Sequence, residues 1–470
     1  MKVSLISVKS EPNLFGFQVP PMACIYLGTI LKQAGHEVRV YDENVCDVYD
    51  RKTGKISSEV LNSEVVGVSL ITPPVPRGEA FLKEIKRQNP EARTLAGGFH
   101  FLDYEEAERF AEFTDLVVRG EGENIIVDAV ENGLEGVVNG VKDGKHELEF
   151  EPVMDLDELP FPDFSIVKNL NKRNWVERAF GKLMPVETSR GCPHKCNFCS
   201  EWKYHGRKTR YKSAERELEE VRRILKMGHN RILFIDDNYS AIPNRRGRLE
   251  SMVKVKERNP RLTTITIDGV PIIRRGEEYI KLMKRAGIDL VMLGVESLNP
   301  KTLEWLGKPH TVEEAERCVK AMARNGIRVH CFGIMHSVYD DEETVIDFSD
   351  KVRKWGAHSI QIVQPIPIPG TNLYEEVENN LLTRDFSSYT GLCYTFDLAN
   401  EGREKALERA GKVERIAKRA WLRFYGRKAL SHVWRAVDAR SYREMVDQLK
   451  EVIPQIFGYY IGTKIKPARI

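Results

Sequence analysis

The chain has few cysteines and no long apolar run. Only eight of its 470 residues are cysteine, which is too few for a disulfide framework in a protein of this length. No apolar stretch approaches the roughly 20 residues that span a bilayer, and the first residues lack the apolar segment of a secretory signal. We therefore expect a cytoplasmic protein, in which clustered thiols bind metal or take part in chemistry.

The chain also lacks an excess of charge of either sign. Lysine and arginine number 72 against 69 aspartate and glutamate residues, which leaves a net charge of +3. This balance gives no global electrostatic reason to expect nucleic acid as a partner. Hydrophobic residues make up 41% of the chain, enough for ordinary cores, and the length indicates roughly two to four domains.

Short β-rich runs alternate with helical patterns over residues 1–138. This order predicts a Rossmann-like, doubly wound parallel sheet, in which ligands bind outside the carboxyl ends of the strands. Glycines follow two of the strand candidates: Gly97 and Gly98 after RTLA, and Gly120 and Gly122 after DLVV. They either only make tight turns or line a ligand crevice. No GxGxxG dinucleotide fingerprint follows the first strand.

Three further parts follow along the chain. Residues 139–180 are acidic, punctuated by proline and poor in periodicity, which predicts a linker. Residues 181–375 hold six strand candidates separated by helical patterns, and they predict a parallel sheet curved into a partial barrel with its chemistry at the strand ends. Strand signals fade after that, so 376–470 is predicted to be helical. The six strand candidates are LMPVETS, RILFIDD, TTITIDG, LVMLGVES, RVHCFGIM and SIQIVQPIPI.

An apolar stripe at helical spacing marks the carboxyl-terminal region, with basic residues around it. The stripe either packs on the barrel or, with its basic neighbours, meets a membrane surface or a lipid. The stripe holds Val413, Ile416, Ala417, Ala420, Trp421 and Phe424, and the basic residues are Lys412, Arg415, Lys418, Arg419, Arg423, Arg427 and Lys428.

Three of the eight cysteines lie within eight residues, directly after the first strand candidate of the barrel. SRGCPHKCNFCS places Cys192, Cys196 and Cys199 on one loop. Thiolates are the usual ligands of iron–sulfur clusters, and a [4Fe-4S] cluster held by three cysteines keeps one iron free. A zinc site closed by His194 is the alternative, although its spacing is cramped.

This motif and the elements after it resemble the radical S-adenosylmethionine enzymes. FIDDNYS (234–240), GVES (294–297), GKPHT (307–311) and GIRVHCFGIMHSVYDDEE (326–343) stand where that family has its other elements. The resemblance implies a [4Fe-4S] cluster on the three cysteines and S-adenosylmethionine on its free iron. For Asp236, Asp237 and Glu296, a capping or salt-bridging role stays open as the alternative to cofactor binding. The cofactor-binding residues implied are Phe198, Asp236, Asp237, Glu296, Ser297, Gly333 and Met335.

The amino-terminal part resembles the cobalamin-binding domain that some of these enzymes carry. The matching stretches are PPMACIYLGTILKQAGHEVRVYD, GVSLIT, LAGGFH and VVRGEGE. The loop SEPNLFGFQVPP has no histidine to ligate cobalt. Either cobalamin has been lost, or it is bound without histidine and apolar residues of a loop such as ITPPVP lie below the cobalt. The cobalamin contacts implied are Ser69, Thr72, Gly97, Gly98, Gly120 and Glu121.

Together the two resemblances imply a cobalamin-dependent radical enzyme. We expect a methyltransferase that acts on an unactivated carbon of an apolar, amphipathic or lipid-like small molecule, with flavodoxin or ferredoxin as electron donor and with peripheral membrane contact through the carboxyl-terminal region. Ring closure or rearrangement of a lipid or pigment is the alternative within the family, and a non-catalytic metal-binding module is the alternative outside it. A methylthiotransferase would need three more amino-terminal cysteines, where the chain has only Cys24 and Cys46.

Overall fold

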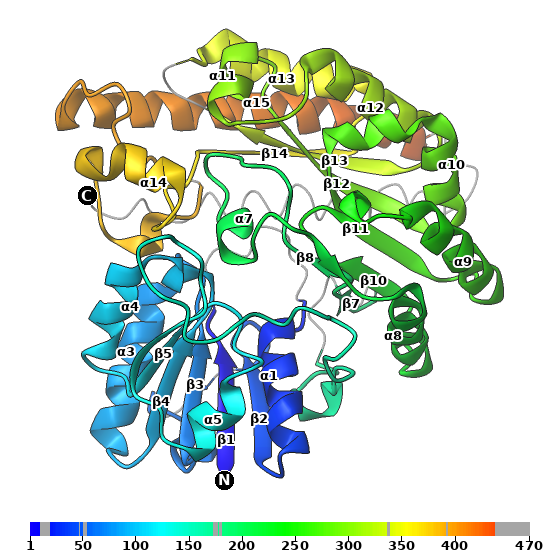
Figure 1. The fold of residues 1–470 in the computed structure, drawn as a ribbon. Helices are drawn as coiled ribbons and strands as arrows, with labels where there is room; N and C mark the ends of the chain where they lie inside the picture. The colour runs from blue at the N-terminus through cyan, green and yellow to red at the C-terminus, as the bar shows by residue number, and fades with distance from the viewer. Residues whose placement is uncertain are drawn as a thin grey trace.

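Two six-stranded parallel sheets form the core of the molecule (Figure 1). The computed structural model describes residues 1–9, 19–46, 48–49, 54–172, 177, 181–335, 339–391 and 393–437. The first sheet ends at Asn139 and the second begins at Leu183. The domain boundaries at 138, 180 and 375 stay predictions.

The first sheet has the strand order β2-β1-β3-β4-β5-β6, with every neighbouring pair parallel. Its strands are near-continuous apolar runs because helices cover both faces. The order reverses between β1 and β3, and a crevice opens outside the strand ends at such a point. The predicted doubly wound domain is thereby confirmed. Its strands are β1 (Lys2–Ser7), β2 (Glu37–Asp42), β3 (Val65–Ser69), β4 (Arg93–Gly97), β5 (Leu116–Arg119) and β6 (Gly136–Asn139), and its helices are α1 (Met22–Gln33), α2 (Ser58–Leu61), α3 (Val75–Gln88), α4 (Tyr104–Ala111) and α5 (Ile126–Glu131).

The second sheet contains all six strands predicted for the barrel, in sequential order from β7 to β14. Its two end strands do not pair with each other, so the barrel is open. Its strands are β7 (Leu183–Val186), β10 (Arg231–Phe234), β11 (Thr263–Gly269), β12 (Ile288–Glu296), β13 (Arg328–Ile334) and β14 (Ser359–Val363). Its helices are α8 (Ala214–Lys226), α9 (Arg245–Arg258), α10 (Glu277–Arg285), α11 (Pro300–Trp305), α12 (Val312–Arg324) and α13 (Glu342–Trp355).

Smaller elements connect these layers. A two-residue antiparallel pair, β8 (Ser189–Arg190) with β9 (Arg210–Tyr211), brackets the cysteine loop and the short helix α7 (Glu201–Tyr204). The helix α14 (Asn372–Val377) follows the second sheet. The 3₁₀ turns are η1 (Phe99–Leu102), η2 (Phe164–Ile166), η3 (Tyr239–Ala241), η4 (Val270–Arg275), η5 (Glu378–Asn380) and η6 (Phe386–Ser388).

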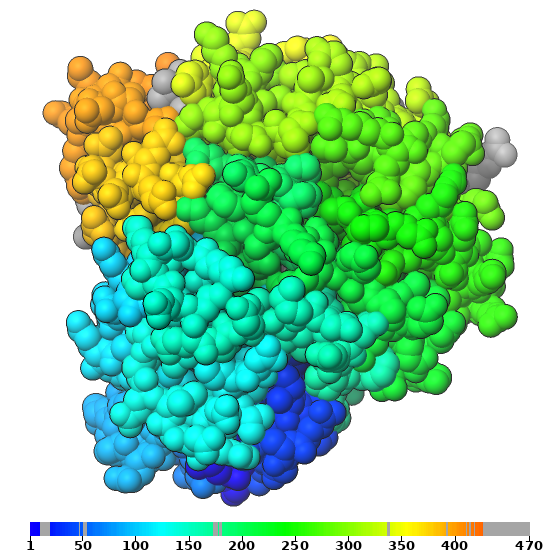
Figure 2. All heavy atoms as spheres, viewed as in Figure 1, coloured from blue at the N-terminus to red at the C-terminus, as the bar shows by residue number. Residues whose placement is uncertain are grey.

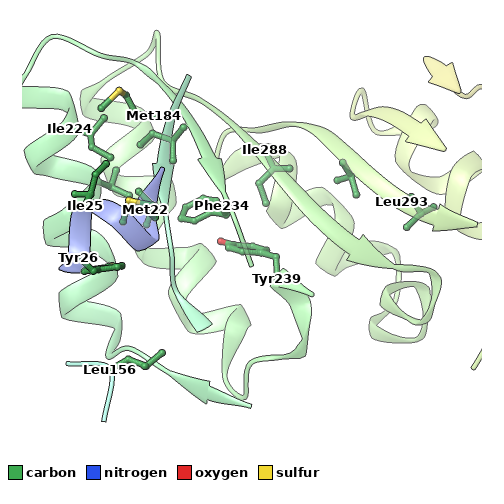
Figure 3. Packing of buried hydrophobic residues seen from close by; sticks show 14 of the residues in the cluster. Met22, Ile25, Tyr26, Leu156, Met184, Ile224, Phe234, Tyr239, Ile288 and Leu293 are labelled. Carbon is green, nitrogen blue, oxygen red and sulfur yellow. The ribbon is translucent and has the colours of Figure 1, made fainter. Parts of the chain in front are cut away.

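One hydrophobic core extends through both sheets and the linker. Buried residues of α1, β7, α8 and the linker belong to the same cluster. Figure 3 shows Ile25 of α1 next to Met184 and Ile224 of the barrel. Leu156 and Phe164 of the linker are buried in this cluster too. The linker therefore joins the two sheets through apolar packing as well as through the chain.

The carboxyl-terminal helix α15 (Arg403–Val437) covers the open edge of the second sheet. The Tyr425 hydroxyl donates to the Ile360 carbonyl at 3.0 Å and accepts from the Ile360 N–H at 2.9 Å, so it satisfies both backbone groups that an edge strand leaves unpaired. Ile416, Ala420 and Trp421 are buried. The predicted stripe thus packs on the barrel along its described side chains; those of Val413, Lys418, Arg427 and Lys428 lie outside the described residues.

Two of the basic residues along α15 bind acidic residues of α13. Arg419 pairs with Glu342, and Arg423 pairs with Asp350 at 2.8 Å. These pairs hold α15 against the protein and explain part of its basic face. Within the part of the chain that the structure describes, every helix is too short or too polar to cross a bilayer.

Replacing Phe424 with alanine tests whether α15 is part of the barrel core. Phe424 is fully buried, and truncation of a buried phenylalanine costs about 3 to 5 kcal/mol of unfolding free energy. We expect a clearly lower midpoint in denaturant-induced unfolding followed by circular dichroism. Leu422→Ala, on the same helix but 60% exposed, should move the midpoint little. Equal effects of the two substitutions would contradict this placement of α15.

Candidate functional site

A cavity of about 350 Å³ lies where the strand ends of the first sheet face the second. Ser69 of β3, Gly97 of β4 and Gly120 after β5 line one side, and Asp237, which follows β10, lines the other. The cavity also extends along the sheet face that α1 and α5 cover, past Gly67 in the middle of β3. It therefore has a wide part between the domains and a narrower part inside the first.

Backbone groups form much of the wall because glycines stand at the strand ends. Gly98 has φ +113°, and a Cβ there would lie 2.8 Å from the Leu70 backbone nitrogen. Only glycine fits such a position without strain. A Cβ on Gly120, which has φ +101°, would meet the Gly140 backbone at 3.1 Å. The glycine turns thus bring main chain close to the cavity, as a large ligand with many amide groups requires.

The structure brings five of the six expected cobalamin contacts to this cavity. Ser69, Gly97, Gly98, Gly120 and Glu121 line it, whereas Thr72 does not. Thr72 is buried with its hydroxyl 3.4 Å from His100 Nδ1, so it supports the GGFH turn from behind. Ile71 of the ITPPVP loop lines the cavity and is 51% exposed.

The cysteine loop is held between its own hairpin and the barrel. The Cys192 N–H donates to the Gly206 carbonyl at 3.2 Å, and the Asn197 N–H donates to the Leu306 carbonyl at 3.0 Å. The Trp202 indole donates to the Cys196 carbonyl at 3.0 Å. All three thiols are free, and burial raises the pKa of each. A thiolate at this loop therefore needs a cation or a cluster to stabilise it.

No three His, Cys, Asp or Glu side chains among the described residues are arranged to hold a single metal ion. The zinc site with His194 thus lacks support from the geometry. In a [4Fe-4S] cluster each thiolate binds a different iron, so the donors need not meet at one point. Three thiols on one anchored loop fit that cluster.

A buried cation stands beside the cysteine loop. Lys308 donates to Glu296 at 3.0 Å and lies 5.8 Å from the Phe198 ring centroid. Burial would lower the pKa of Lys308, but Glu296 and the Cys196 thiol raise it. Glu296 ends β12 with φ +64°, a left-handed conformation that a non-glycine residue adopts at a cost. This strained backbone aims a carboxylate at the loop.

Four of the residues that the resemblance implied for cofactor binding, Glu296, Ser297, Gly333 and Met335, line a crevice of only about 10 Å³. That volume suffices for about one water molecule. A Cβ on Gly333 would lie 2.9 Å from the Phe348 ring, and Met335 packs on Ile416 of α15. The structure therefore brings these residues together without opening a nucleoside pocket, and residues 336–338 next to them lie outside the described part.

The two aspartates of FIDDNYS face different surroundings. Asp236 is buried and accepts hydrogen bonds from the Thr188 N–H at 3.1 Å, the Thr188 hydroxyl at 2.8 Å and the Ser189 hydroxyl at 2.5 Å. These contacts match the structural role that the sequence left open. Asp237 lines the cavity. Burial, and then the charge of Asp237, raise the pKa of Glu201 well above its ordinary value, and burial raises the pKa of Asp237 as well.

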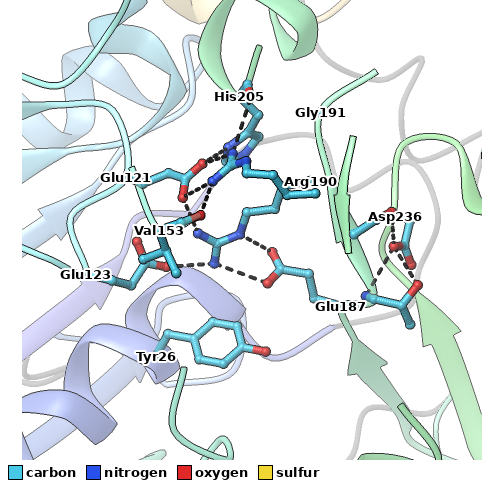
Figure 4. Close-up of polar contacts among 12 residues, drawn as sticks. Tyr26, Glu121, Glu123, Val153, Glu187, Arg190, Gly191, His205 and Asp236 are labelled. Atoms are coloured by element: carbon cyan, nitrogen blue, oxygen red, sulfur yellow. Dashed lines mark hydrogen bonds and ion pairs between the residues drawn. The ribbon is translucent and has the colours of Figure 1, made fainter. Parts of the chain in front are cut away.

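A buried ion network joins the two domains at the cavity wall (Figure 4). Arg190, directly before the cysteine loop, binds Glu121 at 2.8 Å, Glu123 at 2.7 Å and Glu187 at 3.1 Å. His205 binds Glu121 at 2.7 Å. Arg210 contacts Glu121 as well. The GEGE turn of the first domain is therefore fixed to the hairpin that carries the cysteines.

The network favours the charged form of Glu121 although this carboxylate is buried. Burial alone would raise the pKa of Glu121, but hydrogen bonds from His205 and Arg210 hold it well below its ordinary value. Next to the network, the Tyr204 hydroxyl donates to the Gly120 carbonyl at 2.6 Å, and the Tyr204 ring stacks on Phe99 at 4.3 Å between centroids. Glu121 thus acts as an interdomain anchor as well as a lining residue.

Comparison with known families agrees with this architecture. A B12 binding domain model matches residues 13–130, and a radical SAM superfamily model matches residues 186–352. The chain belongs to the radical SAM enzymes that carry a B12-binding domain. The first match covers β2 to β5 of the first sheet, and the second covers β10 to β13 of the second sheet together with the cysteine loop.

Relatives cover most of the chain. An uncharacterized methyltransferase from Pyrococcus horikoshii is 27% identical over 90% of this chain and 92% of its own length. The anaerobic magnesium-protoporphyrin IX monomethyl ester cyclase of Rubrivivax gelatinosus is 26% identical over 79% and 68%, and the hopanoid C-3 methylase of Methylococcus capsulatus is 26% identical over 78% and 71%.

Two solved structures share the fold. The radical S-adenosylmethionine methyltransferase TsrM from Kitasatospora setae superposes with a TM-score of 0.63 at 20% identity, covering 80% of this chain and 76% of TsrM. The cobalamin-dependent S-adenosylmethionine radical enzyme OxsB superposes with a TM-score of 0.65 at 15% identity, covering 100% of this chain and 74% of OxsB. The B12-binding and radical SAM domains of the chain thus have known structural counterparts.

Sequence reasoning missed the residues that join the domains: Glu187, Arg190, Glu201, Tyr204, His205 and Arg210. Arg190 and Glu201 flank the cysteine motif closely, and that proximity was a usable signal. The first-domain partners of Arg190, which are Glu121 and Glu123, lie 69 and 67 residues earlier, so no local pattern links them. Lys308 was also missed, although it lies in the GKPHT motif.

Replacing Arg190 with methionine tests the ion network. Glu123 and Glu187 would lose their cation and Glu121 would lose one of its partners, and removing one partner of a buried ion pair costs about 3 to 5 kcal/mol. We expect a much lower thermal midpoint of the protein. Arg222→Met, at a half-exposed arginine of α8 whose nearest carboxylate oxygen is 3.9 Å away, should change the midpoint little. A stable Arg190→Met protein would contradict the anchoring role.

A pH series on Asp236→Asn tests the burial of that carboxyl. Burial raises the pKa of Asp236 to about 6, even though Arg245 and the two hydroxyls favour its charge. The folded protein then keeps a proton that the unfolded chain releases, so wild-type stability falls as pH rises from about 4 to about 6. The variant lacks this loss, and its stability relative to wild type should rise over that range by up to about 3 kcal/mol. A difference independent of pH would contradict this assignment.

Proposed function

We propose that the chain is a cobalamin-dependent radical SAM methyltransferase whose reaction takes place in the interdomain cavity. The observation that carries the proposal is this cavity, which has glycine-edged strand ends of a B12-binding sheet on one side and the hairpin of Cys192, Cys196 and Cys199 on the other. The bound groups supply one-electron cleavage of S-adenosylmethionine to a carbon radical and delivery of a methyl group to a substrate carbon.

The residues of the first domain would hold cobalamin mainly by shape. Gly97, Gly98 and Gly120 let a broad ring approach the backbone, and Ile71 offers an apolar contact in place of an imidazole. The extension past Gly67 suits the tail of the cofactor. Residues 10–18, in the loop that lacks histidine, lie outside the described part of the chain. Because this loop has no histidine, the proposal includes cobalamin binding without a histidine ligand.

The residues of the second domain would hold the cluster and S-adenosylmethionine. The three thiolates would bind the cluster, while Glu296 and Lys308 at the end of β12 would bind the charged groups of S-adenosylmethionine. Glu201 and Asp237 both line the cavity beside the cysteine hairpin. The small crevice near Met335 implies that side chains there move before adenine binds.

The substrate is an apolar or amphipathic small molecule in this proposal. The cavity wall is rich in Leu, Val, Met and Ile side chains. The names of the relatives also point to lipids and pigments, since they include a hopanoid methylase and two bacteriochlorophyllide d methyltransferases. The relatives also include magnesium-protoporphyrin cyclases, so ring closure is the alternative reaction.

The remaining partners of the enzyme are expectations that follow from this chemistry. A flavodoxin or ferredoxin would supply the electron. Peripheral membrane contact is retained only for the chain beyond Val437, which lies outside the described residues, because the described stripe of α15 is buried. A cytoplasmic location stays a prediction.

Anaerobic reconstitution with iron, sulfide and hydroxocobalamin tests the cofactor set. We expect about four irons and about one cobalt per chain after desalting. Ile71→Asp places a charge at an exposed cavity position and should reduce cobalt while leaving iron unchanged, and Met154→Asp, at an equally exposed position outside this cavity, is the control. Iron without cobalt in the wild type would remove the methyl-transfer mechanism, and zinc alone would contradict the radical chemistry altogether.

A further inference from the structure

Two exposed cations stand beside the cysteine loop on the outside of the molecule. The hairpin brings the turn of residues 206–208 against the loop, because a Cβ on Gly191 would lie 2.8 Å from the Gly206 carbonyl oxygen and 2.9 Å from that of Lys208. Arg207 donates to the Pro193 carbonyl at 3.5 Å. Arg207 and Lys208 are both exposed. Positive charge is therefore fixed next to Cys192.

These cations border a groove of about 980 Å³ between the linker, α4 and α7. Lys142 and Lys145 of the linker segment border it as well. Figure 2 shows the linker in cyan and the segment around α7 in green meeting on the face turned to the viewer. We call Lys142, Lys145, Arg207 and Lys208 the basic rim. Six carboxylates line the groove as well, so the groove carries both charges: Asp103, Glu105, Glu108, Asp143, Glu151 and Glu375.

The basic rim has little compensation from carboxylates of this chain. Among the described residues, no carboxylate forms an ion pair with Lys145, Arg207 or Lys208, and the Glu151 oxygen lies 3.8 Å from Lys142 in an exposed pair. An exposed pair of that length contributes little. The rim thus presents free positive charge to a partner, in a protein whose net charge is only +3.

The floor of the groove is bonded to the cysteine loop. Trp202 lines the groove, and its indole N–H donates to the Cys196 carbonyl at 3.0 Å. A redox centre held in the groove would be separated from the loop by one aromatic side chain and one hydrogen bond.

We propose that the basic rim is the docking site of the electron donor, a small acidic flavin- or iron–sulfur-carrying protein. The inference rests on the proposed function. One electron passes from the reduced donor to the cluster, so the donor is oxidised by one electron and the cluster is reduced by one, and no bond forms or breaks at docking. Complementary charge speeds the encounter of such partners, and weak redox complexes need only a small interface.

The test compares Arg207→Glu/Lys208→Glu with Arg246→Glu/Lys254→Glu in the full chain carrying its reconstituted cluster. Arg246 and Lys254 are exposed cations of α9, away from the groove, so both variants change the charge equally. The probe is a reduced, acidic flavodoxin. Its Kd is measured by biolayer interferometry, and cluster reduction is followed by stopped-flow absorbance. We expect at least about tenfold weaker binding and slower reduction for the rim variant alone at low salt, with the difference shrinking at high salt.

Reduction by dithionite, a small reagent that needs no docking, is the control for the cluster itself. It should be the same in all three proteins. Equal effects of both variants on flavodoxin, or no effect of either, would overturn the docking site while leaving the proposed function intact. If Arg207→Glu/Lys208→Glu also loses reduction by dithionite, the milder variant Arg207→Ala/Lys208→Ala is measured instead. Flavodoxin binding by this variant that is as tight as that of the wild type would overturn the proposal. Weaker binding together with normal reduction by dithionite would support it. A wild type that binds no iron would instead contradict the proposed function.

Discussion

The buried guanidinium of Arg190 is the contact on which the arrangement of both domains depends. It lies one residue before the cysteine loop and binds carboxylates from both domains, at Glu121 and Glu123 of the first and Glu187 of the second. Apolar side chains in contact can slide past one another, whereas a planar guanidinium donates hydrogen bonds to carboxylates only in fixed directions. The network therefore fixes the position of the loop relative to the strand ends of the first sheet. For two cofactors that must act on one substrate, this relative position determines whether the reacting groups can meet.

The fold was largely readable from the sequence, because parallel strands covered on both faces are apolar runs of recognisable length. All six strands of the barrel and five of the six strands of the doubly wound first domain follow from such runs, whereas β6 was not predicted. The helix α15 was readable in its described part for the same reason, since its stripe has helical spacing. The sequence did not decide whether this stripe packs on the barrel or contacts a membrane, because the answer depends on the contact of Tyr425 with the open edge of β14.

The residues of the site could be predicted from the sequence where one short segment supplies them. They could not be predicted where two distant segments meet. Cys192, Cys196 and Cys199 share one loop, and the glycines follow predicted strands, so local spacing sufficed for both. Glu121 was expected to contact cobalamin, and it lines the cavity, yet its carboxylate is bound by Arg190, Arg210 and His205. From the sequence, Asp236 and Asp237 were equal candidates for cofactor binding. Only the tertiary structure shows that Asp236 is buried and that Asp237 lines the cavity.

Buried charge at the domain boundary also explains why the cavity can be apolar elsewhere. Burial of a carboxylate is costly unless cations and hydrogen bonds surround it, and Arg190, His205 and Arg210 concentrate that compensation on one wall. The opposite wall is then left to glycine backbone and aliphatic side chains, which suit a broad, weakly charged cofactor and an apolar substrate. The cysteine hairpin thus has one charged face toward the first domain and another, at Arg207 and Lys208, toward solvent. One short segment of chain therefore carries both the ion pairs that join the domains and the exposed cations beside the cysteine loop.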